Sequence, residues 1–275
     1  MVQSVAEGLN AKGHEVCVIS ASPHQIGNSI EFENGLKIRR FYPPNIYFYS
    51  DASRHSVPVR MLWTLFDTFN FVAAWRVKRI VLEENPDLIL IHNLKGIGYL
   101  VPRLLGRYQS KSVLTLHDVQ LANPSGLIIW GKENNWLNSS FLAKSYAAAC
   151  RWLFAGAPKV ISPSQFLLDF YLSSEFFRKA ETQVVRNPVG FTPEADLPHN
   201  LSMSPRNLSN PTKLLFVGQV EKHKGINWLI ESLPSDISLT VVGDGGELLA
   251  LKKDFPSVNW LGRLSREEIR KIMLT

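Results

Sequence analysis

The chain has 275 residues, of which 45% are hydrophobic and 20% charged, a composition that excludes fibrous and disordered classes and fits two modest globular domains. Its net charge of +6 would suit a phosphate-bearing partner. Because Lys and Arg are scattered along the whole chain and form no single block, we expect no nucleic-acid partner.

The chain begins inside a predicted amphipathic helix. Apolar residues recur at the i, i+3, i+4 and i+7 positions of one helical face, namely Val2, Val5, Ala6 and Leu9. No capping residue precedes them, Gly13 ends the helix, and VCVIS at 16–20 follows as a strand. In a βα unit a strand precedes the helix. Because this chain begins with a helix followed by a strand, we expect a βα unit whose first strand is absent.

Aromatic residues gather between Phe41 and Trp75. They include Trp63, Phe66, Phe69 and Trp75, with Arg60, Arg76 and Arg79 nearby. One interpretation is a helix in peripheral contact with the inner face of a membrane. The other is a helix packed on a sheet, which is favoured because apolar periodicity usually marks a core.

The next elements alternate between helix and strand. A helix over 66–84 leads through Asn85-Pro86-Asp87 into the strand LILI at 88–91, and 113–116 forms another strand. A second helix then presents one face made of Leu142, Ser145, Tyr146, Ala149, Trp152 and Leu153, before the strand KVIS at 159–162. Apolar strands that alternate with helices indicate a parallel sheet covered on both faces, so we expect an α/β domain over 1–190.

A linker is predicted over 191–212, where Pro, Ser and Asn are abundant and periodicity is weak. The βα pattern restarts after it, over 213–275. Strands are expected at KLLFVG, SLTVVGDG and VNWL, with helices between them. Ser265-Arg266-Glu267-Glu268 is a capping box that begins the last helix.

Both cysteines have a simple structural interpretation. Cys17 falls in a predicted strand and Cys150 in a predicted helix, so no disulfide framework is expected and a reducing compartment fits. No apolar run has the length of a membrane span, and the first residues lack the pattern of a signal peptide. We therefore expect a cytoplasmic chain.

Polar and glycine residues follow each apolar strand. They are His92-Asn93, His117-Asp118, Ser162-Pro163, Asn187-Pro188, Gly218-Gln219, Gly243-Asp244-Gly245 and Gly262-Arg263. In open α/β sheets, ligands bind beyond the carboxyl ends of the strands. For Ser162, Ser164 and Asn187 an ordinary turn or cap is the favoured interpretation, whereas the run as a whole predicts a ligand site.

The segment after the first strand of the second domain has the features of an anion site. Gly218 would let a ligand approach the backbone, and the helix beginning near Gly225 would offer free N–H groups. We expect a partly buried Lys224 ammonium to dominate and Gln219 to orient the ligand. A solvated basic turn is the competing interpretation.

Several motifs together resemble the GT-B glycosyltransferases of the large retaining family four. They are EGLNAKGHEV, PDLILIHNLKG, TLHDVQLANPSG, VISPSQFLLDFYL, VVRNPV, LLFVGQVEKHKG, TVVGDGGE and NWLGRLSREEI, in the family's order and at its usual intervals. The resemblance implies two Rossmann-like domains that face each other across a cleft, with the second domain incomplete. It also implies sugar transfer with retention from a nucleotide sugar, UDP or GDP, to a polysaccharide or lipid-linked acceptor, without a metal or other cofactor.

The resemblance also implies roles for individual residues. Lys224 and the position of Gln219 would hold the donor diphosphate beside Gly218 and Gly225, although the family often has Arg where this chain has Gln219. The segment Gly262, Arg263 and Leu264 would border the base. His117 falls where the family places a catalytic histidine near the transferred sugar, and Asn93 and Asp118 are acceptor-side candidates. A helix cap or turn is the competing role for His117.

Two elements of the family are expected to be missing. The first strand with its Gly-rich loop would precede Met1, and the acidic motif that grips the donor would follow Thr275. We therefore expect little turnover from this chain alone, with weak nucleotide-diphosphate affinity retained. Two functions stay open: a glycosyltransferase, or a non-catalytic fragment or half of a split enzyme that needs a partner chain.

Overall fold

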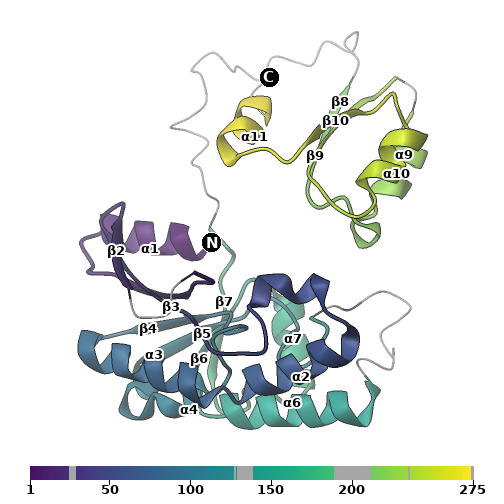
Figure 1. Ribbon diagram of the computed structural model, residues 1–275. Coiled ribbons are helices and arrows are strands. Elements are labelled where there is room, and N and C mark those ends of the chain that lie inside the picture. The colour runs from purple at the N-terminus through teal and green to yellow at the C-terminus, as the bar shows by residue number, and fades with distance from the viewer. Residues whose placement is uncertain (25–28, 127, 129–138, 189–211, 235, 274–275) are drawn as a thin grey trace. The chain divides into compact units, whose positions relative to one another are not determined.

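A computed structural model describes residues 1–24, 29–126, 128, 139–188, 212–234 and 236–273. The chain divides into two compact units, Met1–Gly190 and Phe191–Thr275, and each is described by itself (Figure 1). Almost all of the predicted linker, 191–212, lies outside the described residues. None of the helices in the described part of the chain has the length and apolar content needed to cross a membrane.

The first unit is an α/β structure with two sheets. Its helices are α1 (Val2–Ala11), α2 (Val57–Thr68), α3 (Phe71–Glu84), α4 (Val101–Leu104), α6 (Phe141–Phe154) and α7 (Gln165–Ser173), with 3-10 turns at Tyr49–Arg54 and Gly106–Lys111. Its strands are β1 (Cys17–Ala21), β2 (Ser29–Glu33), β3 (Leu36–Phe41), β4 (Ile89–His92), β5 (Ser112–Thr115), β6 (Lys159–Ser162) and β7 (Glu181–Val184). The sheet β4-β5-β6-β7 is parallel throughout, which confirms the predicted α/β class.

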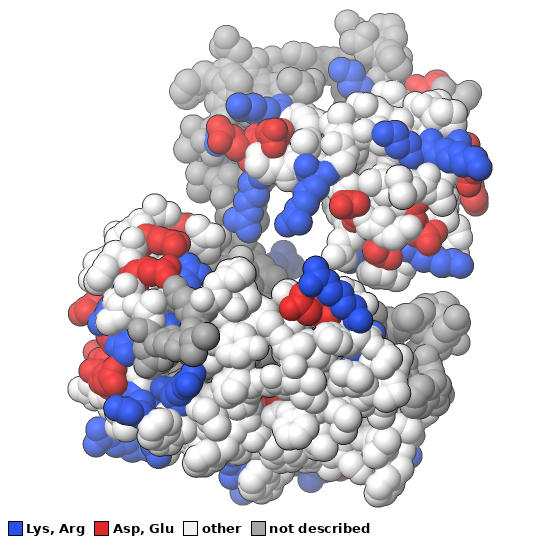
Figure 2. Space-filling model, in the orientation of Figure 1, with Lys and Arg blue, Asp and Glu red and all other residues white. Residues whose placement is uncertain are grey.

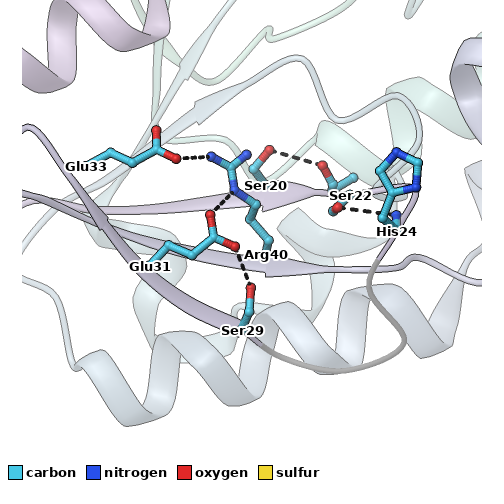
Figure 3. Close-up of polar contacts among 8 residues, drawn as sticks. Ser20, Ser22, His24, Ser29, Glu31, Glu33 and Arg40 are labelled. Atoms are coloured by element: carbon cyan, nitrogen blue, oxygen red, sulfur yellow. Dashed lines mark hydrogen bonds and ion pairs between the residues drawn. The ribbon is translucent and has the colours of Figure 1, made fainter.

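The smaller sheet, β1-β3-β2, contains a hairpin that the strand predictions above did not include. β1 pairs with β3 in parallel and β2 pairs with β3 antiparallel. Asn34 and Gly35 both have positive φ, 51° and 77°, as a two-residue Asn-Gly hairpin turn requires. Arg40 on β3 holds the hairpin by donating to Glu31 at 2.9 Å and to Glu33 at 3.1 Å (Figure 3).

The core of the first unit lies between the parallel sheet and its helices. Buried contributors include Ile80 of α3, Leu153 of α6, Leu114 of β5 and Val160 of β6. The prediction of a single buried face on α6 is wrong in part. Leu142 and Trp152 are exposed on α6, and the guanidinium of Arg103 lies 4.4 Å from the centre of the Trp152 ring.

The helix predicted over 66–84 is in fact two helices. α2 ends at Thr68, and α3 begins after Asn70, whose side chain accepts a hydrogen bond from the backbone N–H of Ala73 at 3.0 Å. Asn is a strong N-cap because its side-chain oxygen satisfies a free N–H of the first turn. The apolar periodicity is continuous across this point, which hid the break from the sequence pattern.

The second unit is a parallel three-stranded sheet with helices. It contains β8 (Lys213–Val217), a 3-10 turn at Lys222–Lys224, α9 (Ile226–Ser232), β9 (Ser238–Val242), α10 (Leu248–Asp254), β10 (Asn259–Gly262) and α11 (Arg266–Met273). The strand order is β10-β9-β8, and α9 and α10 lie together against the sheet (Figure 1). The capping box is confirmed, because Ser265 N donates to Glu268 Oε2 at 2.8 Å and Glu268 N donates to Ser265 Oγ at 3.3 Å.

Candidate functional site

Two histidines meet at the carboxyl edge of the large sheet. His92 is the last residue of β4 and is paired in register with Thr115 of β5, and His117 lies two residues beyond Thr115. His92 Nδ1 is 3.1 Å from His117 Nε2. The parallel pairing of β4 with β5 therefore brings the predicted catalytic residue against a histidine that belongs to the predicted polar run but was given no individual role.

Both imidazoles are held in the neutral form. Burial, and to a lesser degree the neighbouring His117, lower the pKa of His92 to about 4. Burial also lowers the pKa of His117, although Asp118 opposes the shift. One proton is therefore shared between the two facing nitrogens at neutral pH, so His117 acts as a neutral hydrogen-bonding group whose tautomer is coupled to that of His92.

The three residues predicted for this edge of the sheet lie around one small cavity. Asn93, His117 and Asp118 all line a space of about 30 Å³, together with Tyr99 and Tyr171. Such a volume holds about one water molecule. The cavity is therefore too small for a ligand of the size of a sugar ring.

The loop after β5 is fixed by a tyrosine from α7. Tyr171 Oη donates to the Asp118 carbonyl at 2.8 Å and accepts from Leu121 N at 3.1 Å. Asp118 Oδ1 accepts from Gln120 N at 2.8 Å. Because Tyr171 is buried and these bonds tie both sides of the turn, the backbone that carries His117 is held in one conformation.

The loop after β4 is fixed by a buried carboxyl group. Asp67 of α2 accepts a hydrogen bond from Gly96 N at 2.9 Å, and only 2% of Asp67 is exposed. Burial raises the pKa of Asp67 to about 7, against the opposing effects of the Gly96 hydrogen bond and the nearby Lys95. Sequence reasoning missed this residue; its one signal is that it is a single acid within an apolar stripe.

In the second unit the three strand-end loops are tied together. Gly218 N donates to the Val242 carbonyl at 3.0 Å, and Gly243 N donates to the Gly262 carbonyl at 2.8 Å. The predicted donor-binding residues Gly218 and Gly262 therefore lie at the same edge of the sheet, on either side of the Gly243 loop. Gly225 has φ of 72° and follows the 3-10 turn.

The ligand approach predicted at Gly218 stays a prediction, whereas a close backbone contact within the protein requires a different glycine. A Cβ added there would meet only the Phe216 ring, at 3.4 Å, which is an ordinary contact. A Cβ on Gly243 would lie 1.7 Å from the Gly218 carbonyl oxygen, and Gly243 has φ of 152°. The close backbone approach is thus between two loops of the protein, and the glycine that it requires is Gly243.

The environment predicted for Lys224 needs correction. Lys224 is exposed and lies in the 3-10 turn before α9, so it is not the partly buried ammonium that was expected. Gln219 and Arg263 are exposed as well, and Leu264 is half-buried. Neither Lys224 nor Arg263 forms an ion pair with any described residue. Solvent will screen the attraction of these side chains for an anion.

Two expectations stay predictions. Because the two units are described separately, the placement of His117 and Lys224 in one cleft is one of them. The other is transfer without a metal. Within the described ranges, no group of three or more His, Cys, Asp or Glu side chains is suited to a metal.

One family model matches more than half of the chain. A family model described as Glycosyltransferase Family 4 matches residues 1–190. The chain is 26% identical over 227 residues, 82% of its length, to an uncharacterized 42.6 kDa protein in the cps region of Klebsiella pneumoniae. It spans 58% of that relative's length.

Solved structures show the same architecture. HepE of Anabaena in complex with UDP superposes with a TM-score of 0.52 at 17% identity, covering 84% of this chain and 57% of HepE. A trehalose-6-phosphate synthase, studied for glycosyltransfer with retention, gives a TM-score of 0.56 at 12% identity over 99% of this chain and 73% of its own. At these identities the likeness shows the fold, which is the predicted Rossmann-like GT-B type.

Proposed function

The chain belongs to Glycosyltransferase Family 4, and we propose on that basis that it acts in transferring a sugar from a UDP- or GDP-sugar to a polysaccharide or lipid-linked acceptor with retention. The UDP complex of HepE supports a nucleotide-sugar donor. Glycosyltransfer with retention by trehalose-6-phosphate synthase supports the stereochemistry.

The observation that carries this proposal is the neutral His92–His117 pair, with Asn93 and Asp118 beside it, at the carboxyl edge of a parallel sheet. In the transfer, the bond from the anomeric carbon to the diphosphate oxygen breaks while an acceptor oxygen bonds to the same carbon. The acceptor proton leaves with the departing phosphate. His117 hydrogen-bonds the sugar and stabilises the charge that develops on its ring, and His92 fixes the orientation and tautomer of His117.

The second unit would hold the donor through its strand-end loops. Lys224 and Gln219 would contact the diphosphate, and the segment Gly262–Leu264 would border the base. Lys224 forms no ion pair with a described carboxylate, so it keeps its donors for a phosphate. Asn93 and Asp118 would contact the acceptor hydroxyl groups.

The test is sugar transfer by the purified chain, whose turnover is expected to be low, with UDP-glucose, UDP-galactose and GDP-mannose, followed as nucleotide release over long incubations and as product configuration by NMR. His117→Ala should lower kcat about 100- to 1,000-fold, as expected for the loss of a group that stabilises developing charge. His14→Ala replaces an exposed histidine between α1 and β1 and should leave kcat unchanged. Unchanged turnover in His117→Ala, or an inverted product, would contradict the proposal.

A further inference from the structure

The helix α2 buries two polar residues beside Trp63 and exposes several large apolar side chains. Its fully buried residues include Asp67 and Thr68, at 2% and 1% exposure, whereas Leu62, Leu65 and Phe66 are 53–59% exposed. A surface helix normally turns its apolar side chains inward. Since exposed apolar side chains gain free energy when removed from water, this arrangement indicates that the outer face of α2 meets a partner.

The exposed apolar surface continues onto α3. Phe69, Phe71 and Trp75 are 46–59% exposed, and the Asn70 cap lets α3 begin directly beside the end of α2. A groove of about 400 Å³ lies at this junction, lined by Ile46, Phe66, Phe69, Phe71 and Val72 among others. The exposed residues of α2 and α3, with Phe69 between them, form one surface that we call the α2–α3 face. Contiguous apolar surface of this kind marks an interaction site.

The charges on the α2–α3 face all have one sign. Between residues 57 and 82 the single acidic residue is Asp67, which is buried, whereas the segment holds Arg60, Arg76, Lys78 and Arg79. Arg60 and Arg79 are exposed and form no ion pair with a described residue. Figure 2 shows that most of the surface over α2 and the adjoining part of α3 carries no charged side chain. The face is therefore apolar with basic positions and no exposed acid.

An anionic bilayer fits this face better than a second copy of the chain. In an isologous contact the same face lies on both subunits, so Arg60 and Arg79 would meet a surface that offers no exposed carboxylate to pair with. A bilayer containing anionic lipid offers both an apolar boundary for the aromatic side chains and phosphates for the arginines. The Arg79 guanidinium lies 5.1 Å from the centre of the Trp75 ring, and Trp and Arg are the side chains that settle at headgroup level.

We propose that the α2–α3 face docks on the surface of an anionic bilayer. The inference rests on the proposed function in one respect: docking serves catalysis only if the acceptor is lipid-linked. The inward side of α2 holds the loop after β4, because Asp67 accepts a hydrogen bond from Gly96 N, so docking of the outer side would fix the position of that loop relative to the bilayer. Asn93, on the same loop, would thereby be presented to a membrane-borne acceptor.

The experiment measures binding of the purified chain to vesicles of phosphatidylcholine alone and of phosphatidylcholine mixed with phosphatidylglycerol. Sedimentation gives the bound fraction, and a blue shift of tryptophan emission reports insertion. We expect binding to the mixed vesicles about tenfold tighter than to neutral ones, with weakening in salt. Equal binding to both, or binding to neither, overturns the proposal.

Matched variants separate the two components of binding. Phe66→Ser with Phe71→Ser should weaken vesicle binding about tenfold or more, since each removes a phenyl group from the apolar boundary. Phe166→Ser, on α7 and 72% exposed, should not. Arg60→Glu with Arg79→Glu should abolish the preference for anionic vesicles, whereas Lys252→Glu with Lys253→Glu on α10 changes the same net charge and should preserve it. Equal loss in the control variants overturns the proposal.

Two further readouts keep this inference separate from the proposed function. Light scattering gives the oligomeric state, and a dimer that Phe66→Ser dissociates would assign the face to a second copy and overturn the proposal. Sugar transfer to a water-soluble acceptor without vesicle binding would overturn docking and leave the proposed function intact. Vesicle binding without transfer from any nucleotide sugar would support docking and count against the proposed function.

Discussion

At the scale of single residues, Asp67 is a carboxyl group that is almost fully buried, with 2% of its surface exposed. Burial raises its pKa from 3.8 to about 7. A carboxyl group with a raised pKa binds its proton more tightly in the folded chain than in the unfolded chain. The contribution of Asp67 to the free energy of unfolding therefore falls as pH rises from about 4 to about 7. Above that range it does not change further.

Asp67→Asn should remove this dependence. Asn can still accept the hydrogen bond from Gly96 N but has no charge to bury. The variant should gain free energy of unfolding over the wild type between pH 5 and pH 8, by at most about 4 kcal/mol, since each pKa unit corresponds to about 1.4 kcal/mol. Urea unfolding at pH 5, 6, 7 and 8 measures the difference. A gap between variant and wild type that does not change with pH would contradict the raised pKa.

The glycine at the loop contact of the second unit gives a second residue-level prediction. Gly243→Ala places a Cβ 1.7 Å from the Gly218 carbonyl oxygen, with φ in a region that alanine rarely adopts. We expect a loss of about 3 kcal/mol or more in the stability of that unit. Gly218→Ala meets only the Phe216 ring at 3.4 Å and should be nearly neutral. Thermal unfolding of the two variants compares them directly; equal losses would contradict the assignment of the close contact to Gly243.

The sequence was sufficient for some of these residues and not for others. His117, Asn93 and Asp118 were predicted because they follow apolar strands, and strand ends of a parallel sheet converge. His92 was placed in the polar run but received no individual role, because its contact with His117 depends on the register between β4 and β5, which no local pattern specifies. The close contact at Gly243 was not predicted, because a pattern of glycines does not show which one faces a carbonyl group.

At the scale of elements, β3 and α3 are joined by a charged cluster. Arg39, with a side chain only 8% exposed, contacts Glu84 at 2.6 Å and Glu83 at 2.5 Å, and Lys37 contacts Glu84 at 2.7 Å. Burial would raise the pKa of Glu84, but hydrogen bonds from Lys37 and Arg39 lower it overall. The stabilisation from this carboxylate is thus present above its ordinary pKa of 4.5 and is lost as pH falls through the lower, folded value.

Glu84→Gln should accordingly destabilise the first unit at pH 7 by about 2 to 3 kcal/mol, because it leaves Arg39 buried with a weaker partner. The difference from wild type should shrink in acid as the wild-type carboxylate is protonated. Glu181→Gln provides a control, since its pair with Lys159 is exposed and should contribute less than about 1 kcal/mol. Urea titrations at pH 7 and pH 3.5 test both; a loss equal to the control's would show that the cluster is only a surface pair.

The elements themselves were largely predictable from periodicity, with instructive exceptions. Strands β4, β5, β6, β8 and β9 were found because they are apolar runs bounded by polar turns. The hairpin β2–β3 was not, although the Asn34-Gly35 turn was available as a signal. The α2–α3 break was missed because one apolar pattern covers both helices. The apolar residues of that pattern include both buried and exposed side chains. Periodicity therefore does not distinguish a face that packs in the core from one that stays exposed.

At the scale of the whole molecule, the family match and the structure coincide. The match to Glycosyltransferase Family 4 covers residues 1–190, which is also the extent of the first compact unit. The resemblance, which rests on the order and spacing of many short motifs, predicted both the family and the GT-B type of fold. Periodicity alone would have given only an α/β class, because it does not distinguish one doubly wound architecture from another.

The donor site of the second unit can be tested without catalysis. If the basic turn holds a diphosphate, calorimetric titration should detect weak binding of UDP or GDP that weakens further with salt, since Lys224 is exposed and exposed charges are screened over about 10 Å at 0.1 M salt. Lys224→Ala should reduce affinity about tenfold, the lower end for a charge-assisted hydrogen bond, and Gln219→Ala about fivefold. Lys252→Ala on α10 removes the same charge elsewhere in the unit and should change little. Equal affinity of wild type and Lys224→Ala would mean that residues 222–224 are only a solvated basic turn.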